Sequence, residues 1–162
     1  MEVKFKPKIF IHSLLSDDLL SRLEKNFDID HHDTIKSILS GNELLDRVKN
    51  VEGILVQSAL IDKTLIEACP NLKVICNVGV GFDNIDANFC TKMGIQVTNT
   101  PGILNDAVAD MSMALLLAVA RRVPEGDRIV RSGGFKSNFY HLLWGADLRG
   151  ENLGIIGMGS TG

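Results

Sequence analysis

Cysteine, proline and aromatic side chains are scarce in this sequence of 162 residues, which holds three cysteines, four prolines, one tryptophan and one tyrosine. An odd number of cysteines without metal-ligand spacing excludes a disulfide framework and predicts free thiols in a reducing compartment. The longest apolar run, within residues 113–120, is far shorter than the roughly 20 residues of a membrane span, and the first residues contain no apolar signal region. Lysine and arginine form no cluster and the formal net charge is −3, so neither nucleic acid nor an anionic membrane is an expected partner. These absences predict a cytoplasmic globular protein.

The histidines offer little for metal binding. His31 and His32 are adjacent, and neighbouring positions on a strand point to opposite faces of a sheet. His12 and His141 stand alone. The sequence therefore predicts no metal site.

The first hundred residues alternate between short apolar runs and helical patterns. We expect strands at 8–11, around Ile29, and at 53–56, 72–76 and 95–97. Helices are expected between them, the first capped by Ser16 and the third by Asp62. This alternation implies a parallel sheet with right-handed crossovers, covered on both faces. The predicted fold class is α/β, with a flavodoxin-like or Rossmann-like lobe over residues 1–99.

A hinge is expected next, at residues 99–102. Pro101 biases Thr100 towards extended geometry, and Gly102 frees the backbone. Residues 100–162 then form a second part, which opens with one long helix from about Asn105 to Arg131. The first half of that helix is apolar on nearly every side, so it must be buried by a second domain, a dimer partner, or both.

The most informative motif is Gly-x-Gly-x-x-Gly at residues 157–162. An apolar run at 153–156 leads into it and is expected to form a short buried strand. Small residues in such a turn let the backbone approach a pyrophosphate, and a following helix directs its N-terminal N–H groups at that anion. The motif indicates NAD or NADP. The residue that selects between them would follow by roughly 20 positions, so the choice stays open.

Four segments, 78–86, 94–102, 106–122 and 153–159, resemble in order and spacing the D-isomer-specific 2-hydroxyacid dehydrogenase family. Within it they are most similar to the glyoxylate/hydroxypyruvate reductase branch. The resemblance implies a two-lobed subunit with the active site in the cleft and a homodimer held largely by the long helix. Residues 1–99 would be the first part of the substrate-binding lobe. Residues 100–162 would hold the crossing helix, the dimer loop and the truncated beginning of the Rossmann dinucleotide-binding domain.

The resemblance also implies roles for individual residues. The substrate carboxylate would be held by the loop after the fourth strand, whose N–H groups can form an anion-binding concavity; the alternative is a turn that needs glycine only for its geometry. The cofactor residues would lie at the start of the long helix and in the terminal turn. The alternative for the two helix residues is that they are ordinary helix-start and core positions. The expected substrate-binding residues are Val78, Gly79, Val80 and Gly81. The expected cofactor-binding residues are Asn105, Val108, Gly157, Gly159, Ser160, Thr161 and Gly162.

The family's catalytic Arg, Glu and His have no counterpart within residues 1–162, where Arg121 and Arg122 match a structural pair. We therefore expect the chain by itself to be inactive. The loop 135–145 resembles one that reaches the partner's cleft, with Leu142 or Trp144 lining it; the alternative is a surface loop with a buried tryptophan. The function implied is NAD(P)H-dependent reduction of the small 2-oxo acids glyoxylate and hydroxypyruvate to glycolate and D-glycerate. A phosphoglycerate dehydrogenase-like enzyme and a non-catalytic corepressor-like or dimerising fragment are the alternatives.

Overall fold

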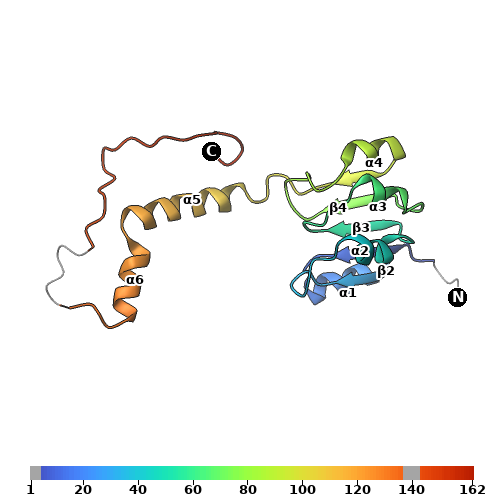
Figure 1. Ribbon diagram of the computed structural model, residues 1–162, viewed down its shortest axis with the longest axis horizontal. Helices are drawn as coiled ribbons and strands as arrows, with labels where there is room; N and C mark the ends of the chain where they lie inside the picture. Colours follow the sequence, from blue (N-terminus) through green and yellow to red (C-terminus); the bar gives the residue numbers. More distant parts are fainter. Residues whose placement is uncertain (1–4, 137–142) are drawn as a thin grey trace. The chain divides into compact units, whose positions relative to one another are not determined.

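The computed structural model describes residues 5–136 and 143–162 (Figure 1). The chain forms two compact units, Met1–Pro101 and Gly102–Gly162. That these units are a substrate-binding lobe and the start of a cofactor domain stays a prediction.

The first unit is built on a five-stranded parallel sheet in the order β2-β1-β3-β4-β5. The strands are β1 (Lys8–His12), β2 (Asp28–His32), β3 (Gly53–Val56), β4 (Val74–Asn77) and β5 (Gln96–Thr98). Phe10 pairs with Ile54, and Ile54 with Ile75. This strand order is that of flavodoxin-like folds, so the predicted α/β parallel-sheet class is confirmed.

Four helices connect these strands: α1 (Asp17–Glu24), α2 (Gly41–Val48), α3 (Lys63–Glu67) and α4 (Ala87–Met93). Both predicted caps are confirmed. The Ser16 hydroxyl accepts from the Leu19 N–H, and the Asp62 carboxylate accepts from the Leu65 N–H at 2.9 Å. Such bonds satisfy N–H groups that a helix start leaves without partners.

The core lies on one face of the sheet. Side chains alternate between faces along each strand, and the paired residues Phe10, Ile54 and Ile75 are all buried there against α2, α3 and α4. On the other face α1 buries none of its own residues, and Leu55 and Cys76 are only partly covered. Ile11, which pairs with Leu55 on that same face, is nevertheless fully buried, so the expected cover is complete on the core face and partial on the other.

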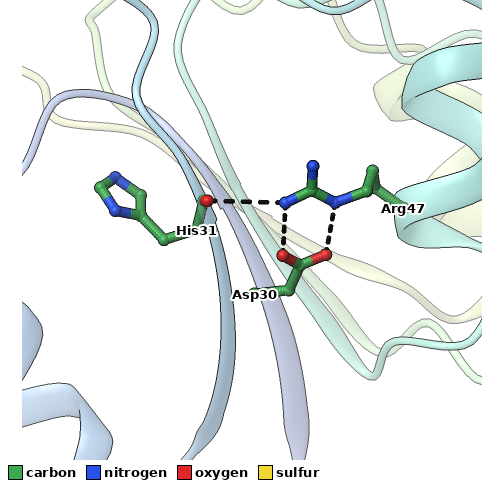
Figure 2. Close-up of polar contacts among 3 residues, drawn as sticks. All are labelled: Asp30, His31 and Arg47. Atoms are coloured by element: carbon green, nitrogen blue, oxygen red, sulfur yellow. Dashed lines mark hydrogen bonds and ion pairs between the residues drawn. The ribbon is translucent and has the colours of Figure 1, made fainter.

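An ion pair fastens the edge strand β2 to α2. Figure 2 shows Arg47 of α2 facing both carboxylate oxygens of Asp30, with a longer contact of 3.5 Å to the His31 carbonyl. The Arg47 Nε donates to Asp30 Oδ2 at 2.6 Å. The guanidinium carbon also lies 5.0 Å from the centroid of the Phe10 ring. The pair thus covers one end of the core as well as joining two elements.

Replacing Arg47 with methionine is expected to lower the free energy of unfolding by about 1 kcal/mol, because it removes a bidentate pair that is only partly exposed. Methionine keeps the apolar stem over Phe10. The matched control is Lys49→Met, whose pair with Asp46 spans the same end of α2 and is mostly exposed; it should change stability little. Urea unfolding followed by circular dichroism measures both. Equal losses in the two variants would contradict the prediction.

The described residues of the second unit form two helices where one was expected. These are α5 (Asn105–Ala120) and α6 (Val123–Arg131), separated at Arg122, whose φ is +56°. The prediction of a single helix over 105–131 is wrong because of Pro124: in a continuous helix its ring would clash with the carbonyl four residues earlier, that of Ala120. That carbonyl accepts instead from the Ala146 N–H at 2.8 Å.

No residue of α5 is buried, although the helix is strongly apolar. Met111, Leu115 and Val119 are all exposed. No helix in the described ranges combines the length and hydropathy needed to cross a membrane.

Candidate functional site

The loop of residues 78–81 leaves the sheet directly after β4. Its first N–H, that of Val78, donates to the Val56 carbonyl of β3 at 2.8 Å, so the loop begins at the carboxyl edge of the sheet. Open α/β sheets bind their ligands at this edge. The structure thus brings the four predicted substrate-binding residues together in one loop, where Val78 and Val80 are exposed.

Three consecutive carbonyls of this loop have hydrogen-bond donors within the first unit. The Gly79 carbonyl accepts from the Thr100 N–H at 3.0 Å. The Val80 carbonyl accepts from the Asn99 side-chain amide at 2.8 Å, and that of Gly81 from the Asn77 side-chain amide at 2.6 Å. Sequence reasoning assigned no role to Asn77 and read Asn99 only as part of a hinge.

The N–H groups of Gly79, Val80 and Gly81 donate to no group in the described part of the chain. Gly79 has a φ of +156°, a conformation essentially reserved for glycine. Free, adjacent backbone N–H groups make a concavity that attracts anions. The geometry is thus suited to the predicted binding of a carboxylate, which stays a prediction.

The terminal motif forms an exposed turn. The Gly162 N–H donates to the Gly159 carbonyl at 3.2 Å, and Gly157 has a φ of +83°. Ser160 and Thr161 lie within this turn. The expected buried strand at 153–156 is not formed, and its residues are exposed. A parallel strand needs ladder partners, and the described residues of this unit contain no other strand.

Asn105 and Val108 lie one turn apart at the start of α5. Asn105 is its first residue, and the Val108 N–H bonds to the Leu104 carbonyl at 2.9 Å. Val108 is 46% exposed, and its alternative role as a core residue stays a prediction. The cofactor role itself stays a prediction.

The predicted partner-reaching loop spans residues 135–145, of which the structure describes 135–136 and 143–145. Leu142, like His141, lies outside the described residues. Trp144 is 70% exposed, so the alternative of a buried tryptophan is wrong.

Across residues 5–136 and 143–162, no three His, Cys, Asp or Glu side chains are placed to hold a metal ion. Burial raises the pKa of the Cys69 and Cys90 thiols, which disfavours the thiolate form that nucleophilic chemistry requires.

A buried histidine at the end of β1 is a feature that sequence reasoning missed. His12 is completely buried, and its Nε2 accepts from the Leu39 N–H at 3.0 Å. Its ring stacks on that of His32, with centroids 5.6 Å apart. The accepting Nε2 places the proton of the neutral ring on Nδ1, which has no partner among the described residues. Burial, and secondarily the nearby His32, lower the pKa of His12.

Comparison with known proteins agrees with this architecture. A family model described as D-isomer specific 2-hydroxyacid dehydrogenase, catalytic domain, matches residues 9–161. The chain belongs to this family. The resemblance found in the four sequence segments is therefore confirmed.

Curated relatives of this dehydrogenase-family chain include two archaeal proteins named glyoxylate reductase. Those of Thermococcus litoralis and Pyrococcus horikoshii are each 43% identical over 97% of this chain, which covers 49% and 48% of their lengths. The chain thus spans about half the length of the curated relatives it matches.

Solved structures of family members share the fold. A putative D-isomer specific 2-hydroxyacid dehydrogenase from Polaromonas has a TM-score of 0.86 at 32% identity, over 97% of this chain and 50% of that one. An NADPH-dependent glyoxylate/hydroxypyruvate reductase from Sinorhizobium meliloti, solved with NADP and malonate, has a TM-score of 0.74 at 30% identity, over 97% of this chain and 48% of that one. These structures have the same parallel-sheet lobe.

Proposed function

We propose that this chain supplies the substrate-carboxylate loop and the start of the cofactor site of an NAD(P)H-dependent reductase of glyoxylate and hydroxypyruvate. The observation that carries the proposal is the loop at 78–81, with its three unpaired N–H groups at the carboxyl edge of the sheet. Both substrates are short 2-oxo acids whose carboxylate such a concavity would accept. The names of the relatives and the malonate in the Sinorhizobium structure support the same ligand class.

The roles within the site follow from the chemistry of each group. The N–H groups of residues 79–81 would orient the 2-oxo acid through its carboxylate. Gly157, Gly159 and Gly162 let the backbone of the terminal turn approach a pyrophosphate, helped by the N–H groups of Ser160 and Thr161. Asn105 and Val108 would, by the family resemblance, contact the nicotinamide side of the cofactor. The nicotinamide cofactor, when bound, supplies the hydride, and NAD and NADP both remain candidates.

Steady-state reduction assays on the protein expressed from its complete gene test this function. Glyoxylate and hydroxypyruvate should be reduced with NADH or NADPH at far higher kcat/KM than 3-phosphohydroxypyruvate. A clear preference for the phosphorylated acid would establish the phosphoglycerate dehydrogenase-like alternative. The 162-residue chain alone is expected to give no turnover, because the resemblance assigns the Arg, Glu and His to positions outside it. Turnover above contaminant level by that chain would overturn this expectation.

We further infer a homodimer in which α5 is covered by the partner. The support is the row of exposed apolar side chains on α5, including Met111, Leu115 and Val119, since an apolar surface of this kind is rarely left bare in a soluble protein. Sedimentation velocity on the protein expressed from its complete gene measures the oligomeric state and tests the inference. A stable monomer at micromolar concentration would contradict it.

A further inference from the structure

The peptide planes of the loop determine where its N–H groups point. In a trans peptide unit the carbonyl of one residue and the N–H of the next lie in one plane and point in opposite directions. A donor that holds the carbonyl of residue i therefore also aims the N–H of residue i+1 in the opposite direction. The three held carbonyls, those of Gly79, Val80 and Gly81, thus set the directions of the N–H groups of Val80, Gly81 and Phe82.

Two of the three donors are side chains. Asn99, just after β5, holds the Val80 carbonyl at 2.8 Å and so aims the Gly81 N–H. Asn77, the last residue of β4, holds the Gly81 carbonyl at 2.6 Å and so aims the Phe82 N–H. The third donor is the backbone N–H of Thr100, which no substitution other than proline removes.

The orientation of the Asn77 side-chain amide is fixed by a second contact, with the side chain of Asn84. Asn77 is only 5% exposed, and its Oδ1 faces the side-chain amide of Asn84 at 3.5 Å. The Asn84 amide in turn donates to the Ala59 carbonyl at 2.8 Å. Because the Gly81 carbonyl can only accept, the Asn77 nitrogen must face it.

We propose that Asn77 and Asn99 are positioning residues of the substrate site, whose side-chain amides turn the loop carbonyls away and direct the N–H groups of Val80, Gly81 and Phe82 at the substrate carboxylate. This inference rests on the proposed function and adds the Phe82 N–H, and the two asparagines, to the site. A carbonyl rotated towards the carboxylate would repel it, whereas three converging N–H groups attract it. The asparagines therefore act on substrate affinity through the backbone and do not touch the substrate.

The decisive variant is Asn99→Asp. It preserves the shape of the side chain but replaces the donating amide with a carboxylate, which repels the Val80 carbonyl and adds negative charge beside the anion site. Asn99 is partly exposed, so the fold should survive. Asn99→Ala removes the donor without adding charge. The matched control is Asn71→Asp, which makes the same charge change at an exposed position before β4, at the opposite edge of the sheet.

The probe is oxamate, a stable mimic of a 2-oxo acid, titrated into the ¹⁵N-labelled whole chain and followed by NMR. In the wild type the amide signals of Val80, Gly81 and Phe82 should shift together. Asn99→Ala should weaken oxamate binding about tenfold, and Asn99→Asp more than that, as expected for loss of an organising hydrogen bond. Core amides such as that of Ile75 should not change, and Asn71→Asp should bind as the wild type does.

The outcomes separate the inference from the function on which it rests. If the wild type binds oxamate without shifting the amides of residues 79–82, or does not bind it, the proposed loop function fails and the inference fails with it. If the wild type binds oxamate at the loop and both Asn99 variants bind it as tightly as the wild type with intact core signals, the positioning role alone is overturned.

In the protein expressed from the complete gene, Asn99→Asp should raise KM for glyoxylate far more than it lowers kcat. An effect on kcat alone would also overturn the positioning role. Asn77→Leu, which keeps the branched shape of the side chain but removes the amide, is a second variant expected to weaken oxamate binding in the same way.

Discussion

Acidification from pH 7.5 to pH 5 is expected to destabilise the first unit through His12, by up to about 1.4 kcal/mol for each pH unit below the model-peptide pKa of the imidazole. Burial holds the native pKa of His12 below 6.5, so the unfolded state takes up this proton first. The contribution of His12 to stability is therefore complete above pH 6.5 and is lost as the pH falls towards the native pKa. Below the native pKa the loss no longer grows.

The geometry around His12 explains why its protonated form is disfavoured. A proton on Nε2 would face the Leu39 N–H, so a hydrogen bond of 3.0 Å would become a contact between two donors. The stacked ring of His32 is the ionisable group that faces it from β2. Arg47 of α2 lies beyond Phe10 and is already paired with Asp30. The charged ring would have no carboxylate partner among these neighbours, and a buried cation without a partner is costly.

His12→Gln is the variant that isolates this effect. The glutamine oxygen can accept from the Leu39 N–H without titrating, so the variant should lose most of the pH dependence between pH 7.5 and 5. At pH 7.5 it should be about 1–2 kcal/mol less stable, because the ring packed between Phe10 and His32 is lost. Urea unfolding at several pH values measures both quantities. Parallel stability curves for wild type and variant would show that another group is responsible.

The features that were predictable from the sequence depend on residues close to one another along the chain. The helix caps at Ser16 and Asp62 are local signals, since each side chain bonds an N–H three residues later. Four of the five strands were found from short apolar or alternating segments between helical patterns, whereas β2, with one apolar residue, was placed only around Ile29. The break between α5 and α6 at Arg122 could also have been predicted from the sequence, because Pro124 cannot continue a helix that includes the preceding turn. It was missed because the apolar pattern of α5 was extended past it.

The features that escaped prediction depend on contacts between distant residues. A strand at 153–156 requires ladder partners, and no local pattern reports whether these exist. Asn99 holds a carbonyl 19 residues away, and His12 accepts from an N–H 27 residues away. No spacing rule links such pairs, so the glycine loop could be recognised while the groups that orient it could not.

The loop itself is expected to depend most strongly on Gly79. Gly79→Ala should weaken oxamate binding by about one to two orders of magnitude, because a φ of +156° costs a residue with a β-carbon about 1–3 kcal/mol. The new β-carbon would lie in ordinary contact, at 3.4 Å, with the Asn77 amide nitrogen that donates to the Gly81 carbonyl, so the strain comes from the backbone conformation. The loop would relieve this strain by rotating its peptide planes, and the N–H groups would no longer converge.

Gly94→Ala is the control that separates strain from function. Gly94 ends α4 with a φ of +73°, and a β-carbon there meets nothing within 4 Å. The substitution carries a similar conformational cost but lies outside the loop. Both variants should therefore unfold at lower urea concentrations than the wild type, while only Gly79→Ala loses oxamate binding by NMR titration. If both lose binding equally, the effect belongs to global stability. If Gly79→Ala binds normally, the carboxylate does not depend on the conformation of this loop, and the proposed substrate site must lie elsewhere.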